Sequence, residues 1–242
     1  MIRKYINIAF ITLMVLGFFS CKKLKTPEAV EEREKWIQSF NDSIKECEII
    51  MNTAEIELGE LNKTINSMMD GFEYVSNPRA VDGYYIIKDW QKKIPMSKTG
   101  IYARLTEQNT LELIATLQGG EFDQISVYTD GEELKSSVVK YDQALNYRHN
   151  NLNTVCFSGG ACDSIAEFIY GYKGHKIKLE FLNGKSSKHI DIPGDEKDMI
   201  ARTWELYDTQ KEIRKLEKDI WISSKKINTY RIMLEKQNSN NQ

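Results

Sequence analysis

The sequence predicts an α+β protein in which two long helices flank a mostly antiparallel β domain with one short helix. Apolar residues recur at alternating steps of three and four over residues 37–72 and again over residues 199–234, which is the a/d pattern of a coiled coil. Between these segments the pattern changes to short β-rich runs bounded by turn residues. Because the two a/d seams have equal length and flank one insert, we expect them to pair as an antiparallel helical hairpin, a stalk.

Residues 1–20 have the features of a signal peptide. Arg3 and Lys4 form a basic n-region, and residues 6–19 form an apolar h-region that is short for a membrane span. The h-region ends in LGFFSC, with Ser20 before Cys21, and this stretch resembles the loose, Bacteroidetes-type lipobox of bacterial lipoproteins. The resemblance implies cleavage between Ser20 and Cys21 and acylation of Cys21, for example with palmitate. The alternative is an ordinary signal peptide or an uncleaved anchor.

The residues after Cys21 bear on the location of the protein. Lys22 stands where an aspartate would retain an enterobacterial lipoprotein in the inner membrane, and Lys22-Lys23 departs from the acidic residues that follow the cysteine in surface-exported Bacteroidetes lipoproteins. The resemblance therefore implies a lipid-anchored protein of the cell envelope, in the outer membrane and facing the periplasm. Each buried CH₂ of such an anchor contributes about 0.8 kcal/mol.

Boundaries between the parts follow from start and stop signals. We expect a lipidated tether over residues 21–30, the first stalk helix over 31–75, the β domain over 81–194, the second stalk helix over 195–236 and a disordered tail over 237–242. Pro27 suits a first helical position, so the first helix can begin near it. Acidic residues open the second helix, where they complement the helix dipole.

The strands of the β domain are predicted from β-rich runs that are bounded by turn residues. We expect strands over residues 84–87, 101–105, 111–117, 124–128, 134–139 and 154–157, and a hairpin that joins 176–182 to 187–192. Residues 146–153 are polar and are predicted to be a loop. Residues 163–172 have helical spacing, with Asp163 or Ser164 available as the N-cap.

The composition and motifs exclude several functions. The formal net charge is −2 with both signs interspersed, so there is no basic footprint for nucleic acid. The chain has no phosphate-binding glycine loop, Walker motif or nucleophile elbow. His149, His175 and His189 do not share a metal-ligand spacing. We therefore expect no metal and no cofactor.

The cysteines leave two interpretations open. An oxidising compartment favours a disulfide between Cys156 and Cys162, because Gly159 and Gly160 let the chain turn between them. Alternatively, Cys162 at the start of a short helix has a lowered pKa and acts with His175 or His189. That layout resembles papain-like and cell-wall-peptidase hydrolases and implies a cell-wall or peptide substrate. Cys47 lies in the first seam, where it is expected to be a buried apolar residue.

The sequence thus favours a non-enzymatic lipoprotein that presents a β domain on a helical stalk to a protein or an envelope polymer. It would meet the membrane through its N-terminal lipid, and homodimerisation through the helices is the alternative to pairing within the chain. A cysteine hydrolase is the second hypothesis. The third is a glycan or small-ligand binding module that uses a cluster of aromatic residues drawn from Tyr84, Tyr85, Trp90, Tyr102, Tyr128, Tyr141 and Tyr147.

Overall fold

The computed structural model describes residues 27–76, 83–93, 98–129, 131–142, 145–184 and 187–239. The chain mixes helix and sheet, with 53% of residues helical and 28% in strands. The predicted mixture of a long C-terminal helix and antiparallel sheets is confirmed. The predicted signal peptide with Ser20 lies outside the described residues, as do Cys21 at the start of the predicted tether and residues 240–242 of the predicted tail.

Two long helices account for most of the helical residues. Helix α2 spans Pro27–Met69 and helix α5 spans Gly194–Ser239. Pro27 opens α2 at a position where its missing N–H costs nothing, and Asp195 and Glu196 in the first turn of α5 complement the helix dipole. Every position of the two a/d seams is buried or half-buried, at residues 37, 40, 44, 47, 51, 54, 58, 61, 65, 68 and 72 and at residues 199, 202, 206, 209, 213, 216, 220, 223, 227, 230 and 234.

The chain divides into two compact units. One consists of Met1–Ile50 and Ser223–Gln242, and the other of Met51–Ile222. In the described part of the first unit, the rings of Phe40 and Tyr230 meet edge to face with their centroids 5.2 Å apart. Arg231 donates to Glu48 across 3.2 Å. The apolar side chains of Cys47 and Ile227 are buried in this unit.

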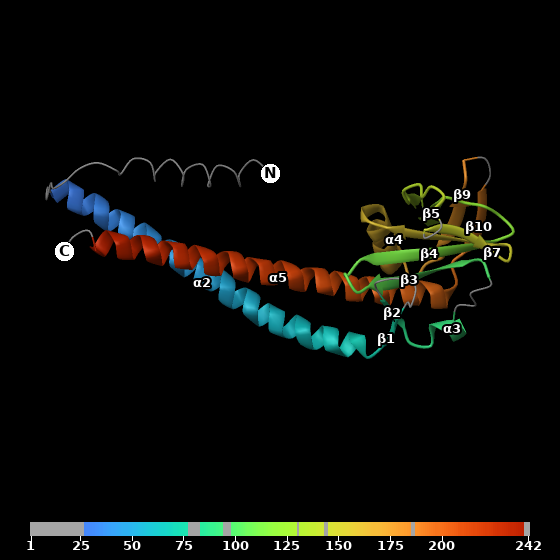
Figure 1. Ribbon diagram of the computed structural model, residues 1–242, viewed down its shortest axis with the longest axis horizontal. Helices are drawn as coiled ribbons and strands as arrows, with labels where there is room; N and C mark the ends of the chain where they lie inside the picture. The colour runs from blue at the N-terminus through green and yellow to red at the C-terminus, as the bar shows by residue number, and fades with distance from the viewer. Residues whose placement is uncertain are drawn as a thin grey trace. The chain divides into compact units, whose positions relative to one another are not determined.

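The second unit contains two antiparallel sheets, drawn in Figure 1. The first, sheet A, has the strand order β1 (Phe72–Val75), β2 (Tyr84–Ile87), β3 (Gly100–Thr106), β4 (Leu111–Gln118), β8 (Leu152–Ser158) and β7 (Asn146–His149). The second, sheet B, has the order β10 (Ser187–Asp191), β9 (Lys178–Leu182), β5 (Gln124–Thr129) and β6 (Glu132–Lys135). Two short helices, α3 (Trp90–Lys93) and α4 (Gly160–Gly171), complete this unit.

Two apolar clusters hold the second unit together. The main core joins residues of β3, β4 and β8 to sheet B, to α4 and to Ile200 and Trp204 of α5. Phe122 lies inside it, edge to face with Phe181. The second cluster contains residues of β1 and β2 together with Trp90, Tyr102, Ile114, Cys156, Met199 and Leu206. Ile65, Met68 and Met69 at the end of α2 pack against this second cluster.

Three helix boundaries differ from those expected, and one short helix is new. The first helix ends at Met69 rather than at residue 75, because the chain turns at Asp70-Gly71 and the next four residues pair with β2 as β1. Helix α3 was not expected. Helix α4 begins at Gly160 instead of residue 163. Its N-cap is Gly159, which has a positive φ of 85° that glycine adopts without strain. Helix α5 continues to Ser239, into the predicted tail.

Two strand predictions were also wrong in part. Residues 146–153 are not a loop, since they contain β7 and the start of β8, joined by a tight turn in which Asn150 and Asn151 have positive φ. The strand expected over 134–139 ends at Lys135. Beyond Lys135, the Ser136 hydroxyl accepts a hydrogen bond from the backbone N–H of Ile125 across 3.0 Å. A side-chain oxygen therefore takes the place of the backbone carbonyl that a continuing strand would offer to this N–H.

Candidate binding surface

A half-buried ion pair lies on sheet A. Arg104 on β3 and Glu112 on β4 are direct partners in the strand register, and Nε of Arg104 donates to Oε2 of Glu112 across 2.5 Å. Burial opposes the charge of the guanidinium, but the carboxylate of Glu112 outweighs burial and raises the pKa of Arg104. The two charges therefore cancel at this position of the sheet.

Aromatic rings surround the ion pair. The guanidinium carbon of Arg104 lies 4.5 Å from the ring centroid of Tyr84 on β2, a cation–π distance. The ring of Trp90 stacks on that of Tyr102, with 6.1 Å between centroids and 27° between planes. Burial raises the pKa of Tyr102, which also interacts electrostatically with Tyr147 on β7. Tyr102 is therefore a neutral phenol at physiological pH.

The strand register places these side chains on one face of sheet A. Tyr102 pairs with Ile114, and Ile114 pairs with Cys156, two residues from the Arg104–Glu112 row. Paired residues point to the same face and alternate residues share a face. The opposite face carries Ile101, Leu113 and Phe157 of the main core, whereas this face contributes Tyr102, Ile114 and Cys156 to the buried second cluster. We call this second face the outer face of sheet A. The outer-face cluster is defined as Tyr84, Trp90, Tyr102, Arg104, Glu112, Tyr147 and Cys156.

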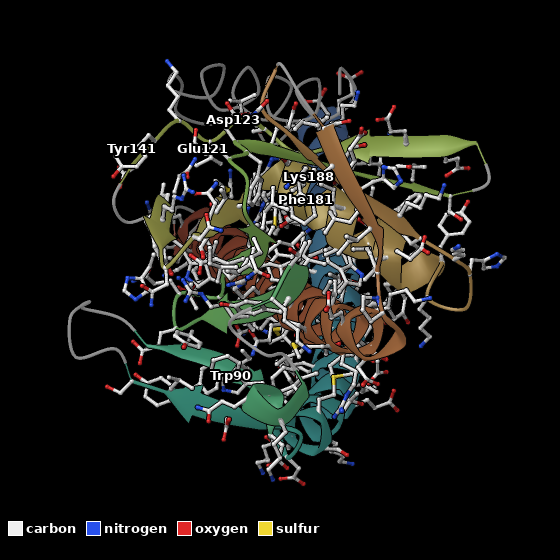
Figure 2. The ribbon with its side chains drawn as sticks, turned by 90° about the vertical axis from the view of Figure 1, so that its right-hand side faces the viewer. Trp90, Glu121, Asp123, Tyr141, Phe181 and Lys188 are labelled. Carbon is white, nitrogen blue, oxygen red and sulfur yellow. The ribbon has the colours of Figure 1, made fainter. Side chains whose placement is uncertain are left out.

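Trp90 and Tyr147 differ from each other in exposure, and the buried Trp90 lacks a hydrogen-bond partner among the described residues. The side chain of Trp90 is only 4% exposed, yet within the described part of the chain its indole N–H has no hydrogen-bond acceptor. Figure 2 labels Trp90 near the β1–β2 end of the second unit. Tyr147, in contrast, is 44% exposed and offers its ring to solvent. Buried donors normally have partners, so Trp90 requires an explanation.

Cys156 is the sulfur member of the outer-face cluster. Burial and the neighbouring Glu112 carboxylate raise the pKa of the Cys156 thiol to about 12. The structure has Cys156 and Cys162 as free, buried thiols, whereas the sequence favoured a disulfide between them. The physical reason is that the two side chains lie in different apolar clusters, Cys156 in the second cluster and Cys162 in the main core.

The residues of the hydrolase hypothesis lie in different environments. Cys162 is in the first turn of α4, and its Sγ contacts the carbonyl oxygen of Leu111 at 3.7 Å. Burial raises the pKa of Cys162 to about 12, which opposes the lowering by the helix dipole that the sequence led us to expect. His175 and His189 are exposed. His175 lies edge to face with Tyr172, and His189 is on β10 opposite Glu180.

Another part of the β domain carries charged and aromatic side chains, of which Figure 2 labels Glu121, Lys188 and Tyr141. Arg148 forms an ion pair with Glu121 at 3.2 Å, and Nζ of Lys188 donates to the carbonyl oxygen of Gly119 across 3.2 Å. Tyr141 is 75% exposed here. Tyr141 belongs to the aromatic residues named from the sequence but not to the outer-face cluster.

Of the aromatic residues named from the sequence, Trp90 stacks on Tyr102 and Tyr84 lies beside Arg104, whereas Tyr147 is on the far edge strand of the same sheet. Tyr85 instead packs against Tyr74 across β1 and β2, with 5.3 Å between ring centroids, and Tyr128 lies on sheet B beside Lys178. Sequence reasoning missed Arg104 and Glu112. The signal was present, since each is a charged residue inside an otherwise apolar run, on the two strands of a single hairpin.

These features define a mixed α and β protein with two antiparallel sheets and a half-buried, charge-balanced Arg–Glu pair beside aromatic side chains on one of them. No family model matches the chain, and no match was found among curated proteins or solved structures. The described residues contain no cluster of three or more histidine, cysteine or acidic side chains that could hold a metal ion. None of the described helices combines the length and the apolar character that a membrane span requires.

Proposed function

We propose that this protein is a non-enzymatic, lipid-anchored component of a bacterial cell envelope, whose helices α2 and α5 pair as an antiparallel stalk and present the β domain to a protein or an envelope polymer. The observation that carries the proposal is the burial of both seams. Each seam residue in α2 and α5 is buried or half-buried, although 28% of the chain is charged and both helices carry many charged residues.

Contacts within each unit support pairing of the two helices in opposite directions. In the first unit, Phe40 and Glu48 contact Tyr230 and Arg231 respectively. In the second unit, the Thr209 hydroxyl lies 3.8 Å from the sulfur of Met68. Residues late in α2 therefore meet residues early in α5, as an antiparallel pair requires. Small seam residues such as Ala54 allow close approach of two helix backbones.

Cross-linking tests whether the pairing is within one chain. In a mature chain without native cysteines, Glu48→Cys and Arg231→Cys are introduced together and treated with a short bismaleimide. We expect a cross-linked product that migrates as a monomer. A matched control carries Ile49→Cys and Ile232→Cys, both at exposed positions of the same helices, and should cross-link poorly. A dimeric product with the first pair would instead show that the helices pair between two copies.

Lipid labelling tests the anchor. The full-length precursor is expressed in a Gram-negative host with an alkyne analogue of palmitate, and the membrane fraction is examined for labelled protein. We expect label on the wild-type chain and none on the Cys21→Ala variant. Unlabelled wild-type protein, or a variant that keeps the label, would contradict the lipoprotein assignment. This outcome is independent of how the helices pair.

A further inference from the structure

We propose that the free edge of strand β7 is a docking site for an extended segment of a partner protein, which adds to sheet A as a further strand. β7 is the last strand of sheet A, and none of the described strands pairs with its other side. This inference rests on the proposed function, because it names the partner as a protein that offers a strand. It uses residues of the second unit only, so its test does not depend on the anchor or on the helix pairing.

The hydrogen-bond register determines which backbone groups of β7 face the free edge. The N–H of Cys156 donates to the carbonyl oxygen of Leu145 across 2.7 Å, so the odd-numbered residues of β7 are turned toward β8. The alternate residues Asn146 and Arg148 are turned away from β8. The N–H of Asn146 already donates to the carbonyl oxygen of Asp142 across 2.7 Å. Arg148 therefore offers its N–H and its carbonyl oxygen to a further strand, and Asn146 offers its carbonyl oxygen.

Exposed apolar side chains accompany this edge. Among the large apolar side chains that are exposed in the described part of the chain, four lie within ten residues: Val138 (55%), Tyr141 (75%), Leu145 (42%) and Tyr147 (44%). Leu145 and Tyr147 alternate along the chain and so share one face of the sheet. An isolated bridge between Asp142 and Asn146 brings the preceding segment to the same edge. Apolar side chains beside an open sheet edge are the features that strand addition uses.

Arg148 specifies what a bound strand carries opposite it. Its side chain lies on the other face from Tyr147, where Nη1 donates to Glu121 across 3.2 Å and Nη2 donates to Asn151 across 2.7 Å. It remains 48% exposed, and a guanidinium has five N–H donors and no acceptor. The residue opposite Arg148 should therefore be an acceptor, a carboxylate or a hydroxyl, and its two neighbours should be apolar and face the side of Tyr147.

A second copy of this chain does not fit the edge as well as a different protein does. Pairing of β7 with β7 of another copy places outward-turned residues opposite each other. If Arg148 were opposite its copy, two positive charges would meet directly, which is destabilising. If Arg148 were opposite Asn146, the incoming strand would meet the segment at Asp142 that already occupies the edge there. The register therefore favours a segment of a different protein.

Peptide selection tests the proposal without a known partner. The mature Cys21→Ala chain is immobilised and used to select linear twelve-residue peptides from a random phage library, and the enriched peptides are synthesised and titrated by calorimetry. We expect enriched peptides with apolar residues at alternate positions and an acidic or hydroxyl residue between them. Binding should be lost with scrambled peptides of the same composition, because strand addition depends on the alternation.

Two proline variants locate the docking edge. Arg148→Pro removes the outward N–H and places the ring at the free edge, where a sheet tolerates proline. We expect it to fold and to weaken peptide binding at least about tenfold. The matched control is His189 on β10, the edge strand of sheet B, because the bond from the N–H of Ile192 to Ile177 shows that the N–H of His189 is also turned outward. His189→Pro should leave the affinity unchanged.

Amide hydrogen exchange gives a second measurement on the unmodified edge. In the free chain the N–H of Arg148 should exchange rapidly and that of Tyr147 slowly, because only Tyr147 is turned toward β8. A bound peptide should slow the exchange of the Arg148 amide by about tenfold or more and leave that of His189 unchanged. This measurement decides the question even where Arg148→Pro disturbs folding.

Three results would overturn the proposal. The first is a selection that yields no peptide with a Kd below about 1 mM. The second is binding that leaves the exchange of the Arg148 amide unchanged or that a folded Arg148→Pro chain retains, since the peptide would then contact another surface. The third is a peptide-free dimer that Arg148→Pro dissociates, which would make a second copy the occupant. Any of these combined with palmitate label and an intrachain cross-link would remove the strand partner and leave the anchor and the stalk intact.

Discussion

Glu196, in the first turn of α5, accepts a hydrogen bond from the backbone N–H of Ile101 on β3, with 2.9 Å between Oε2 and N. Both residues are buried. The bond ties the start of α5 to sheet A, inside the second unit. Gly100 allows this approach, because a Cβ at residue 100 would lie only 2.7 Å from Oε1 of Glu196. Burial raises the pKa of the Glu196 carboxyl group.

Replacing Glu196 separates the hydrogen bond from the charge. Glu196→Ala leaves the buried N–H of Ile101 without this acceptor and should lower the free energy of unfolding by about 1–3 kcal/mol. Glu196→Gln keeps an acceptor oxygen and removes the buried charge, so it should cost much less. Urea denaturation at pH 7 compares the two variants. Equal losses would show that the acceptor role of Glu196 contributes nothing.

The pH dependence of the same position has a defined sign. The pKa of Glu196 is raised from 4.5 in the folded state, so the folded state holds this proton more tightly than the unfolded state does. The resulting stabilisation is present below pH 4.5 and is lost as the pH rises through the raised pKa. The stability of Glu196→Gln relative to wild type should therefore increase from pH 4 to pH 7. Thermal melting at both pH values checks this, and an unchanged difference would contradict it.

Tyr207 on α5 donates a hydrogen bond to Oδ2 of Asp163 on α4 across 2.9 Å. Tyr207→Phe should lower the free energy of unfolding at pH 8 by about 1–2 kcal/mol, because a bond to a charged acceptor is lost. Burial and the bond to Asp163 raise the pKa of Tyr207 from 10.0 to about 12. Wild type should therefore lose stability between pH 10 and pH 12 by a contribution that Tyr207→Phe lacks.

The control for Tyr207 lies on α4. Tyr170 is partly exposed and has Lys173 over its ring, so Tyr170→Phe should change the stability by less than about 0.5 kcal/mol. Guanidinium denaturation at pH 8 and pH 11 measures both variants. A Tyr207→Phe chain as stable as wild type at pH 8 would show that the bond to Asp163 does not link α4 to α5.

Thiol counting decides between the structure and the disulfide expected from the sequence. In a mature Cys21→Ala chain, Cys47, Cys156 and Cys162 are free and buried. We expect no rapid reaction with Ellman's reagent in the native state and three reactive thiols in denaturant without a reductant. One reactive thiol in denaturant would reveal a Cys156–Cys162 disulfide. Fast reaction of native Cys162 would instead revive the hydrolase hypothesis, because a nucleophile must be accessible.

A matched pair of substitutions in α5 tests the seam. Ile227 is 6% exposed at a seam position, and Ile232, five residues later in the same unit, is 44% exposed. Ile227→Asn should destabilise the chain by about 2–4 kcal/mol, because it removes buried apolar surface and buries an amide. Ile232→Asn should have little effect. Similar losses from the two variants, measured by circular dichroism during urea denaturation, would contradict a buried seam at residue 227.

Much of the fold could be predicted because the patterns were local. The four-residue run of β2 and the hairpin of β9 and β10 were recognised from alternation and turn residues, and the helix seams from their spacing. Strand β7 was missed because an edge strand exposed at Tyr147, Arg148 and His149 has no apolar alternation. The start of α4 was missed because its N-cap is glycine and no side chain caps it.

The candidate surface could be predicted only in part, and the reason is register. Aromatic residues are visible in a sequence, but which of them share a face depends on how strands pair. Tyr84 and Tyr85 are neighbours in the chain and point to opposite faces, one toward Arg104 and the other toward Tyr74. The lone donor of Trp90 follows from three-dimensional packing and has no signal in the sequence.

The main core also determines when the chain can fold. Ile200 and Trp204 fill that core, although they belong to the C-terminal helix. Strand β8 can pair with β4 only after β5 and β6 have been synthesised, because these two strands of sheet B lie between β4 and β8 in the chain. Synthesis from the N-terminus therefore leaves the core open until α5 is available, and contacts between distant segments form late. A nascent chain of this kind can complete its main core only near the end of its synthesis, because the C-terminal helix supplies part of that core.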